Sequence, residues 1–185
     1  MSSEYLSLDL PRAQAVPSYI EALQEGYYMG IQPVKTPEEI AEIKADPTAH
    51  LQSLNEQKTG TFETPDGTVT NFVPYETLWL MQGDTFIGSV SFRHVLNEVL
   101  ENFGGHIGYG IRPSYVGKGY ATQALYLTRK KAFSMGIDRL LLTCSPENPA
   151  SEKVIVKNGG EFIDISYKTY GYKMLTKRYW VHTKT

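Results

Sequence analysis

The residues from Ile107 to Leu125 are IGYGIRPSYVGKGYATQAL, and this stretch predicts a strand, a tight turn and a helix. The turn carries Gly117 and Gly119 on either side of Lys118. Two glycines let the backbone approach a ligand closely, and the start of a helix leaves several N–H groups without partners. A turn of this kind binds anions, and phosphate is its usual occupant. Spacing alone leaves a second interpretation open, in which the turn only requires the conformational freedom of glycine.

Two other phosphate-binding motifs fit this turn poorly. A Walker loop requires Ser or Thr directly after the lysine, whereas Gly119 follows Lys118 here. A dinucleotide fingerprint requires a third small residue and an acidic residue about 20 positions on, at the end of the next strand. Asp138 has roughly that spacing, but it precedes its strand and cannot reach a ribose.

The segment after the turn predicts one buried helical face and then two βα units. Its apolar and small residues recur at steps of three and four, which is typical of a helix packed on one side. They are Ala121, Ala124, Leu125, Thr128, Ala132 and Met135, and Gly136 is placed to end the helix. RLLLTC (139–144) predicts a strand covered on both faces. A second helix follows Asn148-Pro149 and ends at residues 158–160, before strands EFIDISYK (161–168) and YKMLTKRYWVH (172–182).

The chain before the turn predicts helices first and strands later. Helices are expected from Pro17 to near Gly26, after the capping box at Thr36, and after Asp46. Residues 59–75 are polar and predict a long loop, and long loops in compact domains tend to be functional. TLWLM (77–81) and FIGSVSF (86–92) predict a hairpin across residues 83–84. A segment with helical character, residues 94–103, and the strand HIGYGI (106–111) complete a mixed α/β sheet in a single domain.

Length and composition indicate one ordinary globular domain. The chain has 185 residues, of which 41% are hydrophobic and 21% charged, and its net charge is −2. No apolar run approaches the roughly 20 residues of a membrane span, and the first residues do not resemble a signal peptide. Cys144 is the only cysteine, so we expect a reducing, cytoplasmic location. The balanced charge argues against nucleic-acid partners, and the basic cluster ending at Lys131 is better explained as the solvated end of a helix.

From Gly105 to Phe162 the chain resembles the GNAT superfamily of acyl-CoA-dependent N-acetyltransferases. The strand ending at Arg112 and the glycine turn match the pyrophosphate motif of that superfamily. Asn148, Ser151 and residues 157–162 are similar to its "N-x-x-S…K-x-G-F" helix, with one extra glycine. FIGSVSFRHVLNEVL, GGHIGYGIRPS and RYWV also resemble a bacterial subgroup of predicted acetyltransferases. The resemblance covers the first 75 residues only loosely.

This resemblance implies one GNAT-like domain over residues 1–185, with an acyl-CoA-binding core at about 105–162. The expected fold has a mostly antiparallel central sheet that is splayed in the middle and flanked by helices. The co-substrate is expected to be acetyl-CoA, without a metal ion. Its binding residues are expected to be Ile111, Arg112, Val116, Gly117, Lys118, Gly119, Tyr120, Ala121, Thr122, Asn148 and Ser151. Ser114 and Val116 depart from the family, which usually has Gln or Arg at the first position and often Arg at the second.

The resemblance also implies direct attack of a primary amine on the thioester. The amine must lose a proton near neutral pH, and His94, at the end of a strand, has a suitable ordinary pKa. Glu98, Glu101 and His106 are competing candidates for the base. The oxyanion would bind backbone N–H groups where strand 106–111 diverges from strand 139–144. Arg93 and Asn97 are expected either to bind an acceptor carboxylate or to fix the local loop.

The tyrosine that often protonates the leaving thiolate is absent from the helix after Asn148. Water is one alternative acid, and Tyr170 is another, with Tyr167 and Tyr172 as neighbours on the same segment. Cys144 fits an inert apolar cysteine better than an acyl carrier. Asn148 has two open interpretations, a helix cap or a contact to the pantetheine arm.

The acceptor is expected to be a small-molecule or peptide amine, without nucleic acid or membrane partners, and a homodimer stays open. The loop at 59–75, with Phe62, Phe72 and Tyr75, is expected to help form the acceptor side. An alternative function is an acyl-CoA-binding sensor or a catalytically impaired GNAT-fold module. The missing tyrosine and the missing basic residues at Ser114 and Val116 keep that alternative open.

Overall fold

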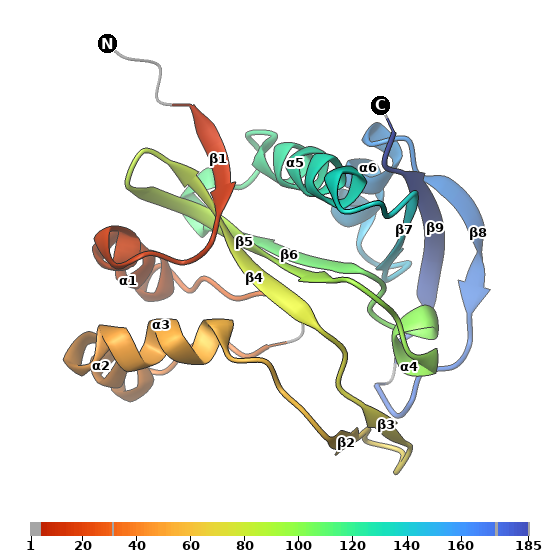
Figure 1. Cartoon of the computed structure of the whole chain (residues 1–185), viewed down its shortest axis with the longest axis horizontal. Coiled ribbons are helices and arrows are strands. Elements are labelled where there is room, and N and C mark those ends of the chain that lie inside the picture. Colours follow the sequence, from red (N-terminus) through yellow and green to blue (C-terminus); the bar gives the residue numbers. More distant parts are fainter. Residues whose placement is uncertain (1–4, 31, 173, 185) are drawn as a thin grey trace. The chain divides into compact units, whose positions relative to one another are not determined.

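The computed structural model describes residues 5–30, 32–172 and 174–184, which form two compact units. The first unit contains residues 1–56, 76–91 and 108–124, and the second contains residues 57–75, 92–107 and 125–185. The predicted order of helices, then an antiparallel meander, then β-α-β-α-β is present, with an additional strand at Leu6–Asp9 and an additional hairpin at residues 61–71 (Figure 1). The predicted class, mixed α/β with a mainly antiparallel sheet and flanking helices, is confirmed as well.

The first unit begins with a strand and three helices. They are β1 (Leu6–Asp9), the short 3-10 helix η1 (Ala13–Ala15), α1 (Val16–Gln24), α2 (Pro37–Ala45) and α3 (Pro47–Asn55). The capping box predicted at Thr36 is present, because Thr36 Oγ1 accepts from the Glu39 N–H and the Glu39 carboxylate accepts from the Thr36 N–H. Strand β1 corrects the expectation that this region is only helical. It pairs antiparallel with β4, from Leu6 opposite Gln82 to Asp9 opposite Trp79. The partners are far apart in the chain, so no local sequence pattern predicts this pairing.

The core of the first unit is aromatic and lies between helices and sheet. The predicted hairpin consists of β4 (Tyr75–Gln82) and β5 (Thr85–Arg93), and the sheet order is β1-β4-β5-β6, with β6 at Ile107–Ile111. Tyr19 of α1 stacks on Trp79 at 4.7 Å between ring centroids, and Phe86 lies edge-on to both rings. Such pairs add about 1 kcal/mol each beyond the burial of their surface. Helices α1 and α2 therefore pack against β4 and β5 through this core.

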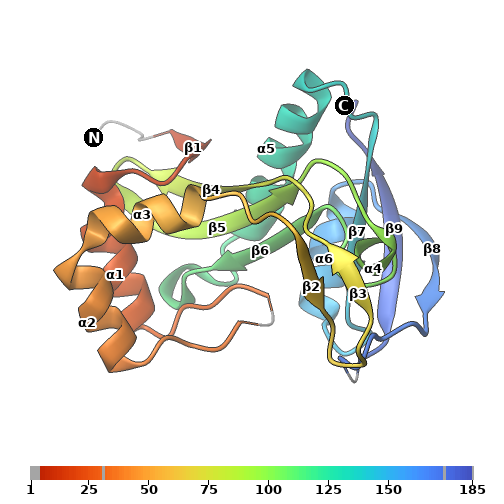
Figure 2. The same ribbon diagram turned by 60° about the horizontal axis from the view of Figure 1, so that its bottom comes forward.

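The prediction of a long loop at residues 59–75 is partly wrong, because this segment contains a hairpin. Strands β2 (Thr61–Glu63) and β3 (Val69–Asn71) pair antiparallel, and Figure 2 shows them side by side. Asp66 organises the turn by accepting from Thr64 Oγ1 and from the Thr68 N–H. The strands have only three residues each and are mostly exposed, so they lack the alternating pattern that identifies a longer strand.

The second unit is built on an antiparallel sheet of order β7-β9-β8. Its strands are β7 (Arg139–Cys144), β8 (Glu161–Ser166) and β9 (Thr176–His182), and α6 (Pro149–Lys157) lies between β7 and β8 in the chain. The segment with helical character is shorter than expected, since α4 contains only Glu98–Asn102, capped by Asn97. Strands β6 and β7 belong to different sheets. Within the second unit, the His106 N–H donates to the Leu141 carbonyl at 2.8 Å, and the Gly104 N–H donates to Thr143 Oγ1 at 3.2 Å.

Helix α5 (Tyr120–Ser134) has the predicted buried face, with one correction. Ala124, Leu125, Thr128 and Ala132 are buried, but Met135 is 43% exposed. The helix ends at Ser134 because Gly136 adopts a positive φ of 77° and its N–H turns back to the Phe133 carbonyl. Met135 therefore lies in the terminating turn and leaves the buried face.

Candidate functional site

The glycine turn of the first unit has the conformation that an anion site requires. Gly117 and Gly119 have φ values of 80° and 87°, a region that favours glycine. A Cβ added at either position would meet nothing within 4 Å, so the protein leaves open space in front of the backbone. Among the described residues, no hydrogen bond is donated by the N–H groups of Gly117, Lys118 or Gly119. N–H groups exposed in this way at the start of a helix have the arrangement that an anion site requires.

Side chains of the turn add one cation and two aromatic rings. Lys118 Nζ donates to the Ser114 carbonyl at 2.8 Å and lies 5.1 Å from the centre of the Tyr115 ring. Tyr120 packs edge-on against Tyr115, and its hydroxyl donates to Gln82 Oε1. Val116 is 64% exposed, so the turn presents an apolar side chain where the family often has arginine.

Three further predicted cofactor contacts flank the turn in the same unit. Ile111 ends β6, six residues before Gly117, and is half-buried. Ala121 and Thr122 lie in the first turn of α5 and are half-buried too. Their position therefore matches the one expected for contacts to a ligand at the helix start.

The side chain of Arg112, which was predicted to contact the phosphate, is bonded within the protein. Its guanidinium is buried and donates to Glu25 Oε1 from both Nε, at 2.8 Å, and Nη2, at 2.6 Å. Its N–H donates to the Ile87 carbonyl, and its carbonyl accepts from the Tyr115 N–H. A guanidinium with these partners is occupied within the protein, so Arg112 supports the turn rather than reaching outward from it.

The predicted contacts on α6 lie in the second unit, at the start of that helix. Asn148 caps α6, because its Oδ1 accepts from the Ser151 N–H at 3.0 Å. Capping, one of the two interpretations of Asn148, is therefore present, although its amide NH₂ keeps donors for another partner. Ser151 is half-buried in the first turn of α6.

His94, the candidate base, follows the last residue of β5. Its N–H donates to the Pro74 carbonyl at 3.1 Å, and its ring lies edge-on to Phe92 at 5.1 Å between centroids. These contacts hold the imidazole at a defined place at the end of the strand. The neighbouring Arg93 directs its guanidinium inward to the carbonyl of Gly105, at 3.1 Å, so Arg93 fixes the local loop.

His106, a competing base, is held as a neutral donor. Its Nδ1 accepts from the Leu141 N–H at 2.9 Å, which places the ring proton on Nε2. The pKa of His106 is lowered to about 4, chiefly by burial and also by the nearby Arg93 charge, although the hydrogen bond from Leu141 raises it. An imidazole with these contacts cannot collect a proton at neutral pH.

Glu98 and Tyr170, the other catalytic candidates, lie close to each other. Each has hydrogen-bonding partners within the protein. The Glu98 carboxylate forms an exposed ion pair with Lys168 Nζ at 2.7 Å, which lowers the pKa of Glu98. The Tyr170 hydroxyl donates to the Glu98 carbonyl at 3.2 Å and accepts from Asn102 Nδ2 at 3.3 Å. Burial raises the pKa of Tyr170, and both functions of its hydroxyl are used. These contacts anchor the turn at 169–172 to α4.

The sequence did not predict a partly buried polar cluster between α6 and β9. Tyr179 of β9 donates to the Glu152 carboxylate of α6, which also accepts from Lys177 Nζ at 2.8 Å. Burial and this carboxylate raise the pKa of Tyr179. Burial likewise raises the pKa of the Cys144 thiol to about 11, as expected for an inert cysteine. The partners are 25 to 27 residues apart in the chain, so no local motif connects them.

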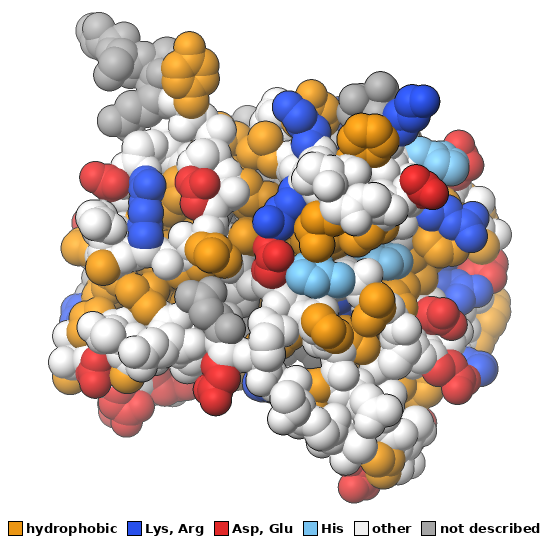
Figure 3. All heavy atoms as spheres, in the orientation of Figure 1, with side chains coloured by type: hydrophobic (Ala, Val, Ile, Leu, Met, Phe, Trp, Pro, Cys, Tyr) orange, Lys and Arg blue, Asp and Glu red, His pale blue; other side chains and the backbone are white. Residues whose placement is uncertain are grey.

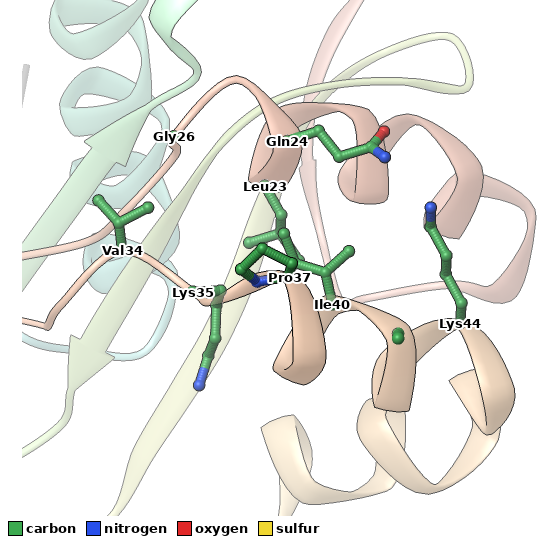
Figure 4. Close-up of a pocket in the computed structure, with 9 residues that line it drawn as sticks. Leu23, Gln24, Gly26, Val34, Lys35, Pro37, Ile40 and Lys44 are labelled. Atoms are coloured by element: carbon green, nitrogen blue, oxygen red, sulfur yellow. The ribbon is translucent and has the colours of Figure 1, made fainter.

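The first unit also contains a surface pocket of about 460 Å³ between α1 and α2 (Figure 4). Its wall is mainly apolar, with Leu23, Val34, Pro37 and Ile40, and Lys44 and Gln24 add polar groups. Lys35 also lines it and pairs with Glu39 at 2.6 Å.

Charges of both signs are mixed on the surface of the described part of the chain drawn in Figure 3. On this face, Lys and Arg side chains are interspersed with Asp and Glu. Within residues 5–30, 32–172 and 174–184, no group of three His, Cys, Asp or Glu side chains is arranged to hold a metal ion. The described helices include none with the length and apolar character of a membrane span.

Comparison with known proteins gives one family and several relatives. A family model described as the acetyltransferase (GNAT) domain matches residues 9–161. The match confirms the resemblance seen from Gly105 onward and extends it back to residue 9. An uncharacterized N-acetyltransferase, YnaD of Bacillus subtilis (strain 168), is 34% identical over 84 residues. That match covers 43% of this chain and only 45% of the length of YnaD.

Solved structures share the fold at low sequence identity. An acetyltransferase (GNAT family) from Bacillus anthracis has a TM-score of 0.63 and 20% identity, and the match covers 100% of this chain and 99% of that one. RimL, a ribosomal L7/L12 α-N-protein acetyltransferase in complex with coenzyme A, has a TM-score of 0.59 and 16% identity, with 98% and 96% covered. The family and these relatives are acetyltransferases, which supports the predicted class of enzyme.

Proposed function

Because the chain belongs to the GNAT acetyltransferase family, we propose that it transfers an acetyl group from acetyl-CoA to a primary amine. The observation that carries this proposal is the turn at Gly117-Lys118-Gly119, with two positive φ values, open space and unpaired N–H groups at the start of α5. The pyrophosphate of acetyl-CoA would bind these N–H groups, which need no particular side chain. Ser114 and Val116 stand where the family often has basic residues. Because the backbone N–H groups remain, this loss should lower the affinity for the pyrophosphate only modestly.

The proposed reaction is direct attack. The amine nitrogen forms a bond with the acetyl carbon, the carbon–sulfur bond breaks, and the thiolate takes up a proton. His94 would accept the proton of the attacking ammonium, because its ring is held at the end of β5 and histidine is the side chain that most often serves as a general base. Glu98 is a weaker base candidate, since its carboxylate is paired with Lys168.

The proton for the thiolate would come from water. Tyr170 is less suitable, because its hydroxyl already donates to the Glu98 carbonyl. Asn148 keeps its amide NH₂ for the pantetheine arm, and Ser151 lies one turn along the same helix.

The acceptor is proposed to be a small molecule or a peptide with a primary amine. RimL is a protein α-N-acetyltransferase, so peptide N-termini belong in the first set of acceptors to test. The hairpin β2–β3 carries Phe62 and Phe72, whose rings lie 4.9 Å apart, and it would contribute to the acceptor side. We further propose that the whole chain works as one cytoplasmic domain without nucleic-acid or membrane partners. A homodimer stays open.

Calorimetry with coenzyme A tests the donor site. Wild-type protein should bind coenzyme A, and Gly119→Ala should weaken binding by about tenfold, because a side chain at φ 87° strains the turn by about 1–2 kcal/mol. Gly136→Ala is the matched control, since Gly136 has a similar φ of 77° and open space but lies at the far end of α5. Equal binding by wild-type protein and Gly119→Ala would place the pyrophosphate elsewhere.

A thiol-release assay across a library of amines and peptides then tests the transfer. Turnover on at least one amine supports the enzyme. Tight binding of acetyl-CoA without turnover on any amine would favour the acyl-CoA sensor instead.

A further inference from the structure

The residue that connects α1 to the glycine turn is Glu25. It follows α1 directly, at the end where a helix disfavours negative charge. Both of its carboxylate oxygens are nevertheless used. Oε1 accepts two hydrogen bonds from Arg112, and Oε2 accepts from the Ser114 N–H at 3.1 Å. Glu25 therefore contacts the backbone that leads into the turn, although it lies 89 residues away in the chain.

The contacts continue from Ser114 into the turn itself. The Ser114 peptide group donates its N–H to Glu25, and its carbonyl accepts from Lys118 Nζ at 2.8 Å. The ring of Tyr115 lies 5.7 Å from the Arg112 guanidinium and 5.1 Å from Lys118 Nζ. One side of the turn is thus fixed through a continuous set of charged hydrogen bonds, whereas a Cβ added at Gly117 or Gly119 would face open space.

Arg112 makes this arrangement electrostatically compatible with a phosphate. An unpaired carboxylate this close to the turn would repel an anion, but the buried guanidinium compensates its charge. Arg112 is itself held by Ser18 Oγ at 3.0 Å and by Glu21 at 3.1 Å, and its N–H is bonded to β5. Arg112 therefore cannot leave Glu25 to bind a ligand without leaving a buried network unsatisfied.

We propose that Glu25 is a positioning residue that preorganises the pyrophosphate-binding turn through Arg112 and the Ser114 peptide. This inference rests on the proposed function, because it assumes that the turn binds the pyrophosphate of acetyl-CoA. A turn already held in its binding conformation does not have to be ordered by the ligand, so less binding free energy is lost. Loss of Glu25 should therefore raise the KM for acetyl-CoA and leave kcat nearly unchanged.

The test compares three variants by calorimetry with coenzyme A. Glu25→Ala should bind about tenfold more weakly than wild-type protein. Glu25→Gln keeps the shape of the side chain, but its single oxygen cannot serve both Arg112 and Ser114, so it should bind more weakly by about threefold. Glu42→Gln removes the same charge from an exposed position on α2 and should bind as wild-type protein does.

Amide NMR signals of Gly117 and Gly119 give a second readout that does not depend on ligand. They should shift or broaden in Glu25→Ala and stay unchanged in Glu42→Gln. Tighter binding by Glu25→Gln would mean that the carboxylate acts only as a repelling charge, which overturns the inference. Unchanged binding and unchanged glycine signals in Glu25→Ala would also overturn it. Wild-type protein that fails to bind coenzyme A would instead overturn the proposed function.

Discussion

Replacing Gly110 with alanine should destabilise the first unit, because the backbone of another segment occupies the space of the missing side chain. A Cβ at Gly110 would lie 2.5 Å from the Tyr28 carbonyl oxygen and 3.2 Å from Met29 Cα. The first distance is about 1 Å shorter than ordinary van der Waals contact. Both neighbours are main-chain atoms, so a side-chain rotation cannot relieve the overlap. Either β6 or the segment after α1 must move.

The expected cost is about 3 kcal/mol, at the upper end of the range for overpacking a close-packed site. For a protein of this size that corresponds to a fall of about 6–12 °C in Tm. Gly108→Ala is the matched control, two residues earlier on the same strand. A Cβ there meets nothing within 4 Å, and Gly108 has no positive φ. This variant should lie within about 0.5 kcal/mol of wild-type protein or be slightly more stable.

Tryptophan fluorescence during urea unfolding can report on this unit alone. The chain has two tryptophans, Trp79 in the core of the first unit and Trp180 in the second. With Trp180→Phe as the common background, the signal comes from Trp79, which is 1% exposed. Equal stability of the Gly110→Ala and Gly108→Ala variants would refute the close approach of Tyr28 to β6.

Three further predictions concern charge and reactivity. The pKa of Glu25 is lowered from 4.5 to about 2, chiefly by hydrogen bonds from Arg112, so its contribution to stability is complete above about pH 5 and is lost as the pH falls toward 2. Between pH 7 and pH 3, wild-type protein should lose about 1–2 kcal/mol more unfolding free energy than Glu25→Gln, measured by urea titration; parallel losses would contradict the ion pair. His94→Gln should lower kcat by about 100-fold, with little change in the KM for acetyl-CoA. Glu98→Gln, at an exposed side chain, should change kcat less than about twofold. An unchanged kcat in His94→Gln would exclude His94 as the general base. Cys144, with a thiol pKa raised to about 11 by burial, should react with iodoacetamide at pH 7.5 far more slowly in the folded than in the urea-unfolded protein; similar rates would show that the thiol is accessible.

Local signals in the sequence predicted the elements that local chemistry determines. The capping box at Thr36, the Asp46 cap and the glycine end of α5 each depend on residues within a few positions of one another. The glycine turn belongs to the same class, because its positive φ values follow from Gly117 and Gly119 themselves. These features, together with the motif after Asn148, were sufficient for the family and for the candidate donor site.

Features that depend on partners distant in the chain were not predictable in this way. Strand β1 exists because it pairs with β4, more than 70 residues later, and the hairpin at 61–71 is too short to show a periodic pattern. The roles of single side chains follow the same rule. Tyr170 and Glu98 look like catalytic groups in the sequence, but the fold gives each a hydrogen-bonding partner that fixes it.

The sequence by itself determined that the turn at 117–119 can cradle an anion, since glycine conformation and helix polarity are local properties. Only the tertiary structure decided which residue holds that turn. Arg112 carries the charge that a phosphate contact needs, yet the carboxylate of Glu25 lies within 2.6 Å of it and takes up its donors. A charged side chain binds whichever partner the fold brings nearest, and that partner is set by the packing of α1 against the sheet, not by the neighbours of Arg112 in the chain.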